Sequence, residues 1–168
     1  MLFRLALVCF FTSYSLLLSA QTDSVQQVIN QTVWKPFMEA FGQLEAERLN
    51  SLHTKDVLRA TSWTIREGEE YFENNKRRFA KNKKEKRHYA LELRLDEYKA
   101  TDKVAFNTGY YKTQTITEGK VSRTSYGRFH VILRKVDGVW KIAQDWDSNK
   151  INGVRVTEAD FLKAAPIE

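Results

Sequence analysis

The sequence predicts an α+β domain in which the helices come first and an antiparallel sheet follows. Before about residue 81, apolar side chains recur every three or four positions, which is typical of helices that pack through one face. From His88 onward they alternate with polar residues, which is typical of strands with one buried face. Asp137 and Gly138 lie between two such strands and indicate a tight hairpin turn. Helices followed by consecutive strands define the α+β class.

Three helices and one short strand are predicted in the first half of the chain. The first helix has an apolar face of residues spaced by four, namely Val25, Ile29, Val33, Phe37 and Phe41. Pro36 interrupts this face, so the helix either kinks there or a new helix begins with Pro36 in its first turn. A short second helix is expected to end near His53. A strand over residues 56–63 and a third helix over residues 69–81 follow.

Four strands are predicted in the second half. Alternation assigns one apolar face to each strand, and these faces are Tyr89, Leu91, Leu93 and Leu95; Val104, Phe106, Thr108 and Tyr110; Phe129, Val131 and Leu133; and Trp140, Ile142, Gln144 and Trp146. Hydrophilic connections between the strands make them consecutive and antiparallel. An inserted residue, or β-bulge, would exchange the two faces of a strand.

The first twenty residues have the layout of a secretory signal peptide. Arg4 precedes an apolar run, and the small residues Ser19 and Ala20 come just before Gln21. A retained membrane anchor is the alternative, but the run is shorter than the ~20 apolar residues that span a bilayer. We therefore expect cleavage after Ala20 and an exported chain, periplasmic or secreted, over residues 21–168, without a membrane span.

The composition fits a single globular domain over residues 21–168. With 42% hydrophobic and 12% aromatic residues, the chain has enough apolar surface to bury one core. Its one cysteine, Cys9, lies within the expected signal peptide, so no disulfide is expected. Much of the net charge of +6 lies between Lys76 and Arg87. No nucleic-acid-binding motif accompanies this basic run, so we expect a solvated helix end and no nucleic-acid partner.

Several short motifs follow one another along nearly the whole expected mature chain. In the helical half they are Lys35-Pro36-Phe37 with Ala40-Phe41, the passage Leu52-His53-Thr54-Lys55-Asp56-Val57, and Gly68-Glu69-Glu70-Tyr71. In the last hairpin they are Leu133-Arg134-Lys135, then Gly138, then Trp140-Lys141-Ile142, and a closing Asp145-Trp146-Asp147-Ser148. Together these motifs resemble the SnoaL-like branch of the nuclear transport factor 2-like superfamily.

This resemblance implies a conical α+β fold in which a curved antiparallel sheet packs against about three helices. Proteins of this superfamily often leave an apolar cavity between the sheet and the helices, and they often dimerise through the sheet. The resemblance therefore implies a homodimer. Some members are isomerases, dehydratases, cyclases or epoxide hydrolases, and many only bind a ligand.

The predicted faces select candidates for the lining of such a cavity. The apolar candidates are Trp34, Phe37, Phe106 and Trp146, and the polar candidates are Thr108, Tyr110 and Gln144. Strict alternation puts Asp145 and His130 on the opposite faces of their strands, unless a bulge intervenes. His53, at the end of the second helix, either reaches the opening of the cone or caps the helix end. We favour the second reading, in which Tyr110 likewise covers the edge of the core with its hydroxyl in water.

Enzyme chemistry fits the sequence less directly. The isomerases of this superfamily carry a catalytic carboxylate after the second helix, where this chain reads Arg59-Ala60-Thr61-Ser62-Trp63. The remaining catalytic candidates are His53, Tyr110 and Asp145, with undetermined roles. The three histidines are far apart in sequence and no Gly-x-Ser-x-Gly motif is present, so we predict no metal site, no cofactor and no nucleophilic triad.

The sequence thus predicts an exported domain that binds a small molecule in a conical apolar pocket. One alternative is an acid–base enzyme of the isomerase, dehydratase or cyclase type that acts on a small apolar substrate. A second alternative is an envelope interaction module that uses the basic run between Lys76 and Arg87 to bind anionic cell-surface polymers. A cone filled by its own side chains would favour this second alternative.

Overall fold

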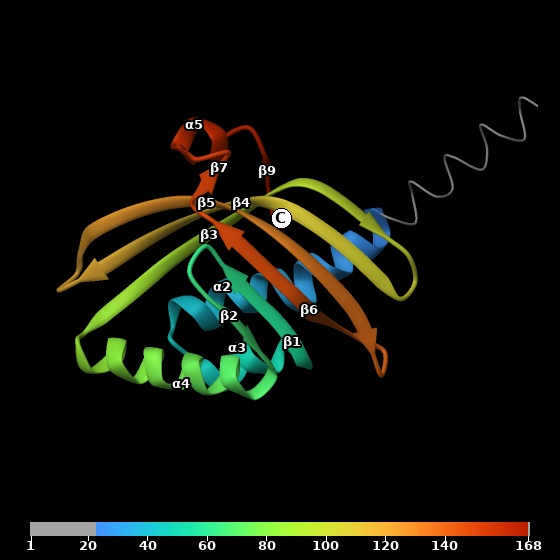
Figure 1. Cartoon of the computed structure of the whole chain (residues 1–168), viewed down its shortest axis with the longest axis horizontal. Helices are drawn as coiled ribbons and strands as arrows, with labels where there is room; N and C mark the ends of the chain where they lie inside the picture. Colours follow the sequence, from blue (N-terminus) through green and yellow to red (C-terminus); the bar gives the residue numbers. More distant parts are fainter. Residues whose placement is uncertain (1–22, 168) are drawn as a thin grey trace, which may run out of the picture.

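The computed structural model describes residues 23–167, in which helices cover one face of a strongly curved sheet (Figure 1). The helical layer consists of helical residues 23–29, the π-helical turn η1 (Asn30–Trp34), α2 (Lys35–Gly42), α3 (Ala46–Ser51) and α4 (Gly68–Lys84). This architecture confirms the predicted α+β cone. The expected signal peptide lies outside the described residues. None of the helices described in residues 23–167 is both long and apolar enough to cross a membrane.

The main sheet has seven strands in the order β2-β1-β6-β5-β4-β3-β9. Their bounds are β1 (His53–Thr61), β2 (Ile65–Glu67), β3 (Arg87–Ala100), β4 (Val104–Thr117), β5 (Lys120–Val136), β6 (Val139–Ser148) and β9 (Ala165–Pro166). Strands β3 to β6 form the predicted antiparallel meander. Strand β1 runs parallel to β6, so the sheet is mixed and not wholly antiparallel as predicted. The long connection from β1 through α4 to the meander permits this arrangement.

Pro36 begins a new helical segment without interrupting the helical path. The backbone N–H of Lys35 bonds to the carbonyl of Asn30, five residues earlier, which closes a π-helical turn. Pro36 then lies in the first turn of α2, directly after this π-helical turn. The structure thus supports the second of the two predicted alternatives.

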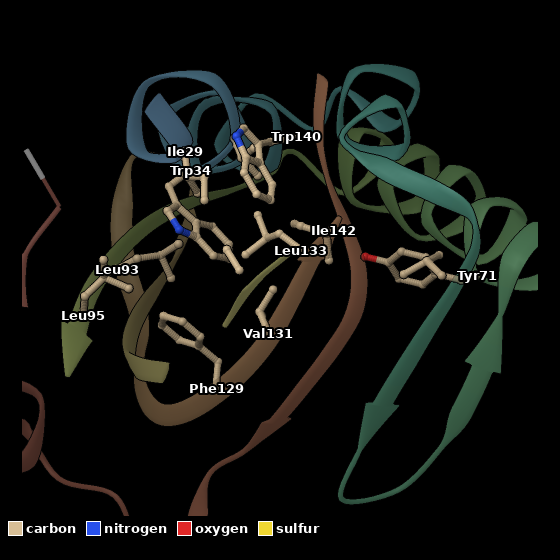
Figure 2. Close-up of a cluster of buried hydrophobic side chains, with 13 residues drawn as sticks. Ile29, Trp34, Tyr71, Leu93, Leu95, Phe129, Val131, Leu133, Trp140 and Ile142 are labelled. Carbon is tan, nitrogen blue, oxygen red and sulfur yellow. The ribbon is translucent and has the colours of Figure 1, made fainter. Parts of the chain in front are cut away.

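The main hydrophobic core lies between the helices and the inner, concave face of the sheet (Figure 2). Its fully buried members include Ile29 and Val33 from the first helical segment and Leu133 and Ile142 from β5 and β6. Trp34 is anchored in this core because its indole N–H donates a hydrogen bond of 2.8 Å to the side-chain oxygen of buried Asn107. The predicted faces of β3 and β5 and the first half of β6 are confirmed.

A β-bulge in β6 reverses the predicted orientation of the second half of this strand. Leu133 of β5 pairs with Ile142, whereas the preceding Ile132 pairs with Gln144, so Ala143 is an extra residue. Beyond the bulge, Gln144 and Trp146 lie on the outer face. Their predicted position on the inner face is wrong, because the bulge brings Asp145 and Asp147 inward in their place.

The predicted face of β4 is also wrong. Its inner residues are Ala105, Asn107, Gly109, Tyr111 and Thr113, and its outer residues are Val104, Phe106, Thr108 and Tyr110. The prediction assigned the apolar side chains of β4 to the inner face, but the outer face of this strand is also apolar because it is partly covered. The helix α5 (Glu158–Phe161) lies on that face and buries a second cluster, made of Tyr110, Val156, Phe161 and Ala164 (Figure 1).

The segment after β6 was not anticipated from the sequence. A small two-stranded sheet, β7 (Lys150–Ile151) and β8 (Val154–Arg155), leads into α5. Thr157 caps α5 through a capping box with Asp160, which satisfies backbone N–H groups at the start of this one-turn helix. These elements hold the C-terminal segment against the outer face of β4 and β5.

Candidate functional site

A cavity with two lobes lies between the helices and the inner face of the sheet. The apolar lobe has a volume of ≈ 200 Å³ and is lined mainly by Trp34, Leu91, Leu93, Tyr111, Thr113, Phe129, Val131 and Asp147. The polar lobe has a volume of ≈ 170 Å³ and is lined mainly by Leu49, Thr61, Arg66, Tyr71, Asn74 and Asn75. Both lobes share five lining residues: Phe37, Phe41, Arg59, Arg78 and Asp145. The cone is therefore not filled by its own side chains.

A cluster of three charged residues forms the polar part of the cavity wall. Arg59 comes from β1, and Asp145 and Asp147 come from the adjacent β6, where Arg59 and Asp145 are register partners. The Arg59 Nε lies 3.3 Å from an oxygen of Asp145, and an Nη of Arg59 donates to Asp147. The three side chains are only 18%, 11% and 19% exposed, so this Arg59–Asp145–Asp147 cluster is largely removed from water.

Burial and mutual charge set the proton affinities of this cluster. Burial raises the pKa of Asp147 above its usual range, and the Asp145 carboxylate raises it further, although Arg59 opposes both effects. Burial alone would lower the pKa of Arg59, but the two carboxylates outweigh it and raise that pKa. Arg59 is therefore a permanent cation. Asp147 holds a proton to higher pH than an ordinary aspartic acid does.

Two tyrosines border the cluster. Tyr71 reaches from α4 with its hydroxyl directed toward β6, as Figure 2 shows. Burial and the charge of Asp145 raise the pKa of this hydroxyl. Burial and the charge of Asp147 raise the pKa of Tyr111, on the opposite wall, well above its usual range. Both phenols therefore remain protonated at neutral pH and can donate hydrogen bonds to a bound molecule.

Two glycines give the aromatic walls their positions. Gly109 pairs with Phe129 across β4 and β5, and a Cβ on Gly109 would lie 2.7 Å from the Phe129 ring. Gly127 pairs with Tyr111, and a Cβ there would collide with the Tyr111 ring. The Tyr111 ring thus lies across Gly127, and the tip of the Phe129 ring lies against Gly109. These rings and the adjacent apolar lobe occupy the space that side chains at positions 109 and 127 would otherwise fill.

The structure divides the predicted ligand-binding residues between two faces. Trp34 and Phe37 line the cavity, and their rings lie 6.0 Å apart in an edge-to-face arrangement. The other five predicted residues lie on the outer side of the sheet: Phe106, Thr108, Tyr110, Gln144 and Trp146. The predicted single pocket that combines all seven does not form. The bulge in β6 and the apolar outer face of β4 explain the difference.

The three catalytic candidates are likewise separated. Asp145 lines both lobes of the cavity. Tyr110 is on the other side of the sheet, where the guanidinium of Arg128 lies 5.7 Å from the centre of its ring. His53 is buried beside the cavity at the start of β1 and does not reach the opening of the cone.

His53 is held as a neutral imidazole among aromatic rings. Its Nδ1 lies 2.8 Å from the carbonyl oxygen of Leu49, so this nitrogen carries the hydrogen and donates it. The rings of Tyr71 and Phe37 lie 5.2 and 6.0 Å from the imidazole. Burial lowers the pKa of His53 to about 4, although the bond to Leu49 opposes this effect. Nε2 has no hydrogen-bond partner among the described residues.

Sequence reasoning missed Arg59, Arg78, Tyr111 and Asp147 as residues of the cavity. The signal for Asp147 was its spacing of two from Asp145, which places both carboxylates on one face of a strand. Gly109 and Gly127 were a second signal, because a glycine within a strand often marks a close approach of another group.

Within residues 23–167, no three His, Cys, Asp or Glu side chains are grouped so as to hold a metal ion.

The chain matches no protein family model and no curated protein. It is similar in structure to a conserved protein from Planctomyces limnophilus, with a TM-score of 0.61 and 17% identity, over 74% of this chain and 96% of the other. An NTF-2 like protein of unknown function from Shewanella oneidensis has a TM-score of 0.56 and 19% identity, over 75% and 96% of the two chains. A ketosteroid isomerase-like protein from Erwinia carotovora has a TM-score of 0.57 and 13% identity, over 73% of this chain and 95% of the other.

These structures show the fold that the sequence motifs indicated, while membership of the SnoaL-like branch stays a prediction. At sequence identities below 20%, structural similarity shows a shared fold. It does not transfer a ligand or an activity from one protein to another. The chain has the nuclear transport factor 2-like fold.

Proposed function

We propose that this protein binds a small, largely apolar molecule in the two-lobed cavity. The observation that carries the proposal is a cavity with aromatic walls in which a few buried polar groups converge from β1, β4, β6 and α4. Sites for small molecules are mostly apolar, with a small number of polar groups that orient the ligand. Here Asp145 and Asp147 supply acceptors, and Tyr71 and Tyr111 supply donors.

Binding is expected to change tryptophan emission, because Trp34 lines the apolar lobe. We would titrate residues 21–168 with small hydrophobic acids, ketones and polycyclic compounds and compare the response with that of Trp34→Phe. At least one class of compound should give a saturable change that Trp34→Phe largely removes. Trp63, on the surface and 74% exposed, offers the matched control Trp63→Phe, which should keep the response. Unchanged emission across the panel would contradict the proposal.

An acid–base enzyme is the second candidate, and the raised pKa of Asp147 favours it. A carboxyl group whose pKa lies closer to neutrality is a better proton donor and acceptor in catalysis. Tyr111 lines the same lobe and could stabilise a developing oxyanion. The test is deuterium uptake from D₂O into bound ketones, followed by NMR. Uptake that Asp147→Asn abolishes while binding persists would identify the protein as an enzyme.

We further propose a homodimer formed through the outer face of the sheet. Half-buried aromatic side chains run across three strands there, with ring distances of 6.2 Å from Phe106 to His130 and 5.0 Å from His130 to Trp146. Such a row would be covered if a second copy packed against it. Sedimentation velocity should give a dimer for the natural chain and a monomer for Trp146→Glu.

Export remains part of the proposal, on the sequence of the first twenty residues alone. The mature protein should begin at Gln21, and amino-terminal sequencing of exported material tests this directly.

The envelope interaction module is less favoured, because the cone holds an open cavity. Its basic run does present exposed lysines in the last turn of α4, namely Lys81, Lys83 and Lys84, and Lys86 just after it.

A further inference from the structure

We infer that the ligand of this cavity is an anion, a carboxylic acid with an apolar body, and that Arg78 binds its charged end. The inference rests on the proposed ligand-binding function and assigns the chemical class of that ligand. It follows from a comparison of the three arginines that line the cavity, Arg59, Arg66 and Arg78. An arginine can serve a ligand only through N–H groups that the protein leaves free.

Arg59 has little left to offer a ligand. A guanidinium carries five N–H donors. The Nε of Arg59 faces Asp145, one Nη donates to the Asp147 carboxylate, and the other Nη lies 2.7 Å from the carbonyl of Ala60 and 3.3 Å from that of Asp145. Its charge is likewise compensated by two carboxylates. Arg59 therefore organises the cavity wall and is not the anchor for an anion.

Arg78 is different, because no carboxylate of the described residues pairs with it. Arg66, by contrast, has Glu70 at 3.4 Å. The one side-chain hydrogen bond of Arg78 in the described structure goes to the neutral amide oxygen of Asn75, at 3.2 Å. Its guanidinium lies 5.4 Å from the centre of the Phe41 ring and 4.9 Å from that of Phe79. These rings fix the position of the cation without neutralising it.

The position of Arg78 suits the charged end of an elongated ligand. Arg78 lines both lobes and is exposed, so it lies where the cavity meets solvent. An anion there would keep part of its hydration. The apolar body would then enter the lobe walled by Phe129 and its neighbours. Helix α4 carries six basic and three acidic residues, which also attracts anions toward this opening.

The test uses matched probes that differ only in charge. Three skeletons (2-naphthyl, phenylethyl and nonyl) are each titrated by calorimetry as the carboxylic acid, the primary amide and the aminomethyl analogue. For the skeleton that binds best, the acid should bind about tenfold or more tightly than the amide, because charge-assisted hydrogen bonds exceed neutral ones. Arg78→Gln should remove this preference, and Arg78→Lys should retain part of it. Arg77→Gln, on the exposed neighbour that does not line the cavity, should leave it unchanged.

Each outcome decides the inference. Equal binding of acid and amide, tighter binding of the amine, or a preference that survives in Arg78→Gln would overturn it and leave the proposed function standing. Absence of binding by all nine probes, with folded protein confirmed by circular dichroism, would overturn the proposed function as well. If Arg78→Gln does not fold, Arg78→Lys decides in its place. A preference reduced in size supports the inference, because a lysine cannot form the two parallel bonds of a guanidinium, and a preference of unchanged size overturns it.

Discussion

Replacing Arg59 by leucine is expected to lower the free energy of unfolding by roughly 3–5 kcal/mol, the usual cost of removing one partner from a buried ion pair. The substitution leaves the carboxylates of Asp145 and Asp147 side by side with no cation in contact, and both side chains are less than 20% exposed. Their mutual repulsion and lost solvation both oppose folding. Urea unfolding at neutral pH measures the effect.

Two further variants show whether the loss comes from unpaired charge. Arg59→Leu combined with Asp145→Leu and Asp147→Asn should recover much of the stability, since no buried charge is left without a partner. Arg48 offers a surface control, because it pairs with Glu39 and Glu45 while 42% exposed. Arg48→Leu should cost far less than Arg59→Leu, because exposed ion pairs contribute little to stability. If Arg59→Leu costs no more than this control, the cluster is not the buried unit described.

The second large effect is a loss of stability as the pH falls from about 6.5 to about 4, caused by His53. In the folded protein the pKa of His53 is lowered to about 4, from an ordinary value of 6.5. Between these values the unfolded chain binds a proton that the folded chain does not, so the free energy of unfolding falls as the pH falls. Each pKa unit is worth about 1.4 kcal/mol, so the full loss is about 3 kcal/mol.

The contribution of His53 is isolated by comparing variants, because carboxylates titrate in the same range. The decrease in unfolding free energy between pH 7 and pH 4 should be smaller in His53→Leu by about 3 kcal/mol at most. His88→Leu, at an exposed position, should keep the decrease of the natural chain. Identical pH profiles for His53→Leu and the natural chain would show that His53 is not buried as a neutral group.

The sequence predicted those parts of the fold in which one physical signal dominates. Leu93 in β3 and Val131 in β5 alternate cleanly with polar residues, and both face the core as expected. The bulge at Ala143 left no mark in the pattern, because Gln144 and Trp146 continue the alternation of Trp140 and Ile142. An alternating pattern cannot report an inserted residue when both faces of the strand carry large side chains.

The cavity was harder to predict because its residues come from elements that only the fold brings together. In the sequence, the segment that contains Arg59 was notable only because it lacks the catalytic carboxylate of the isomerases. The parallel pairing of β1 with β6 places Arg59 beside Asp145 and Asp147. Arg78 lay within a basic run and resembled any solvated helix end. Its role depends on the rings of Phe41 and Phe79, which only the packed structure places under its guanidinium.

The central claim, that the cavity holds a small molecule, is tested most directly by mass spectrometry of the protein purified after export under non-denaturing conditions. The natural chain should carry a bound molecule that is released on denaturation. Thr113→Phe, which places a ring inside the apolar lobe, should lack it, whereas Lys112→Phe, on the outer face of the same strand, should retain it. A natural chain without any bound molecule, or Thr113→Phe carrying it as fully as Lys112→Phe does, would contradict the account.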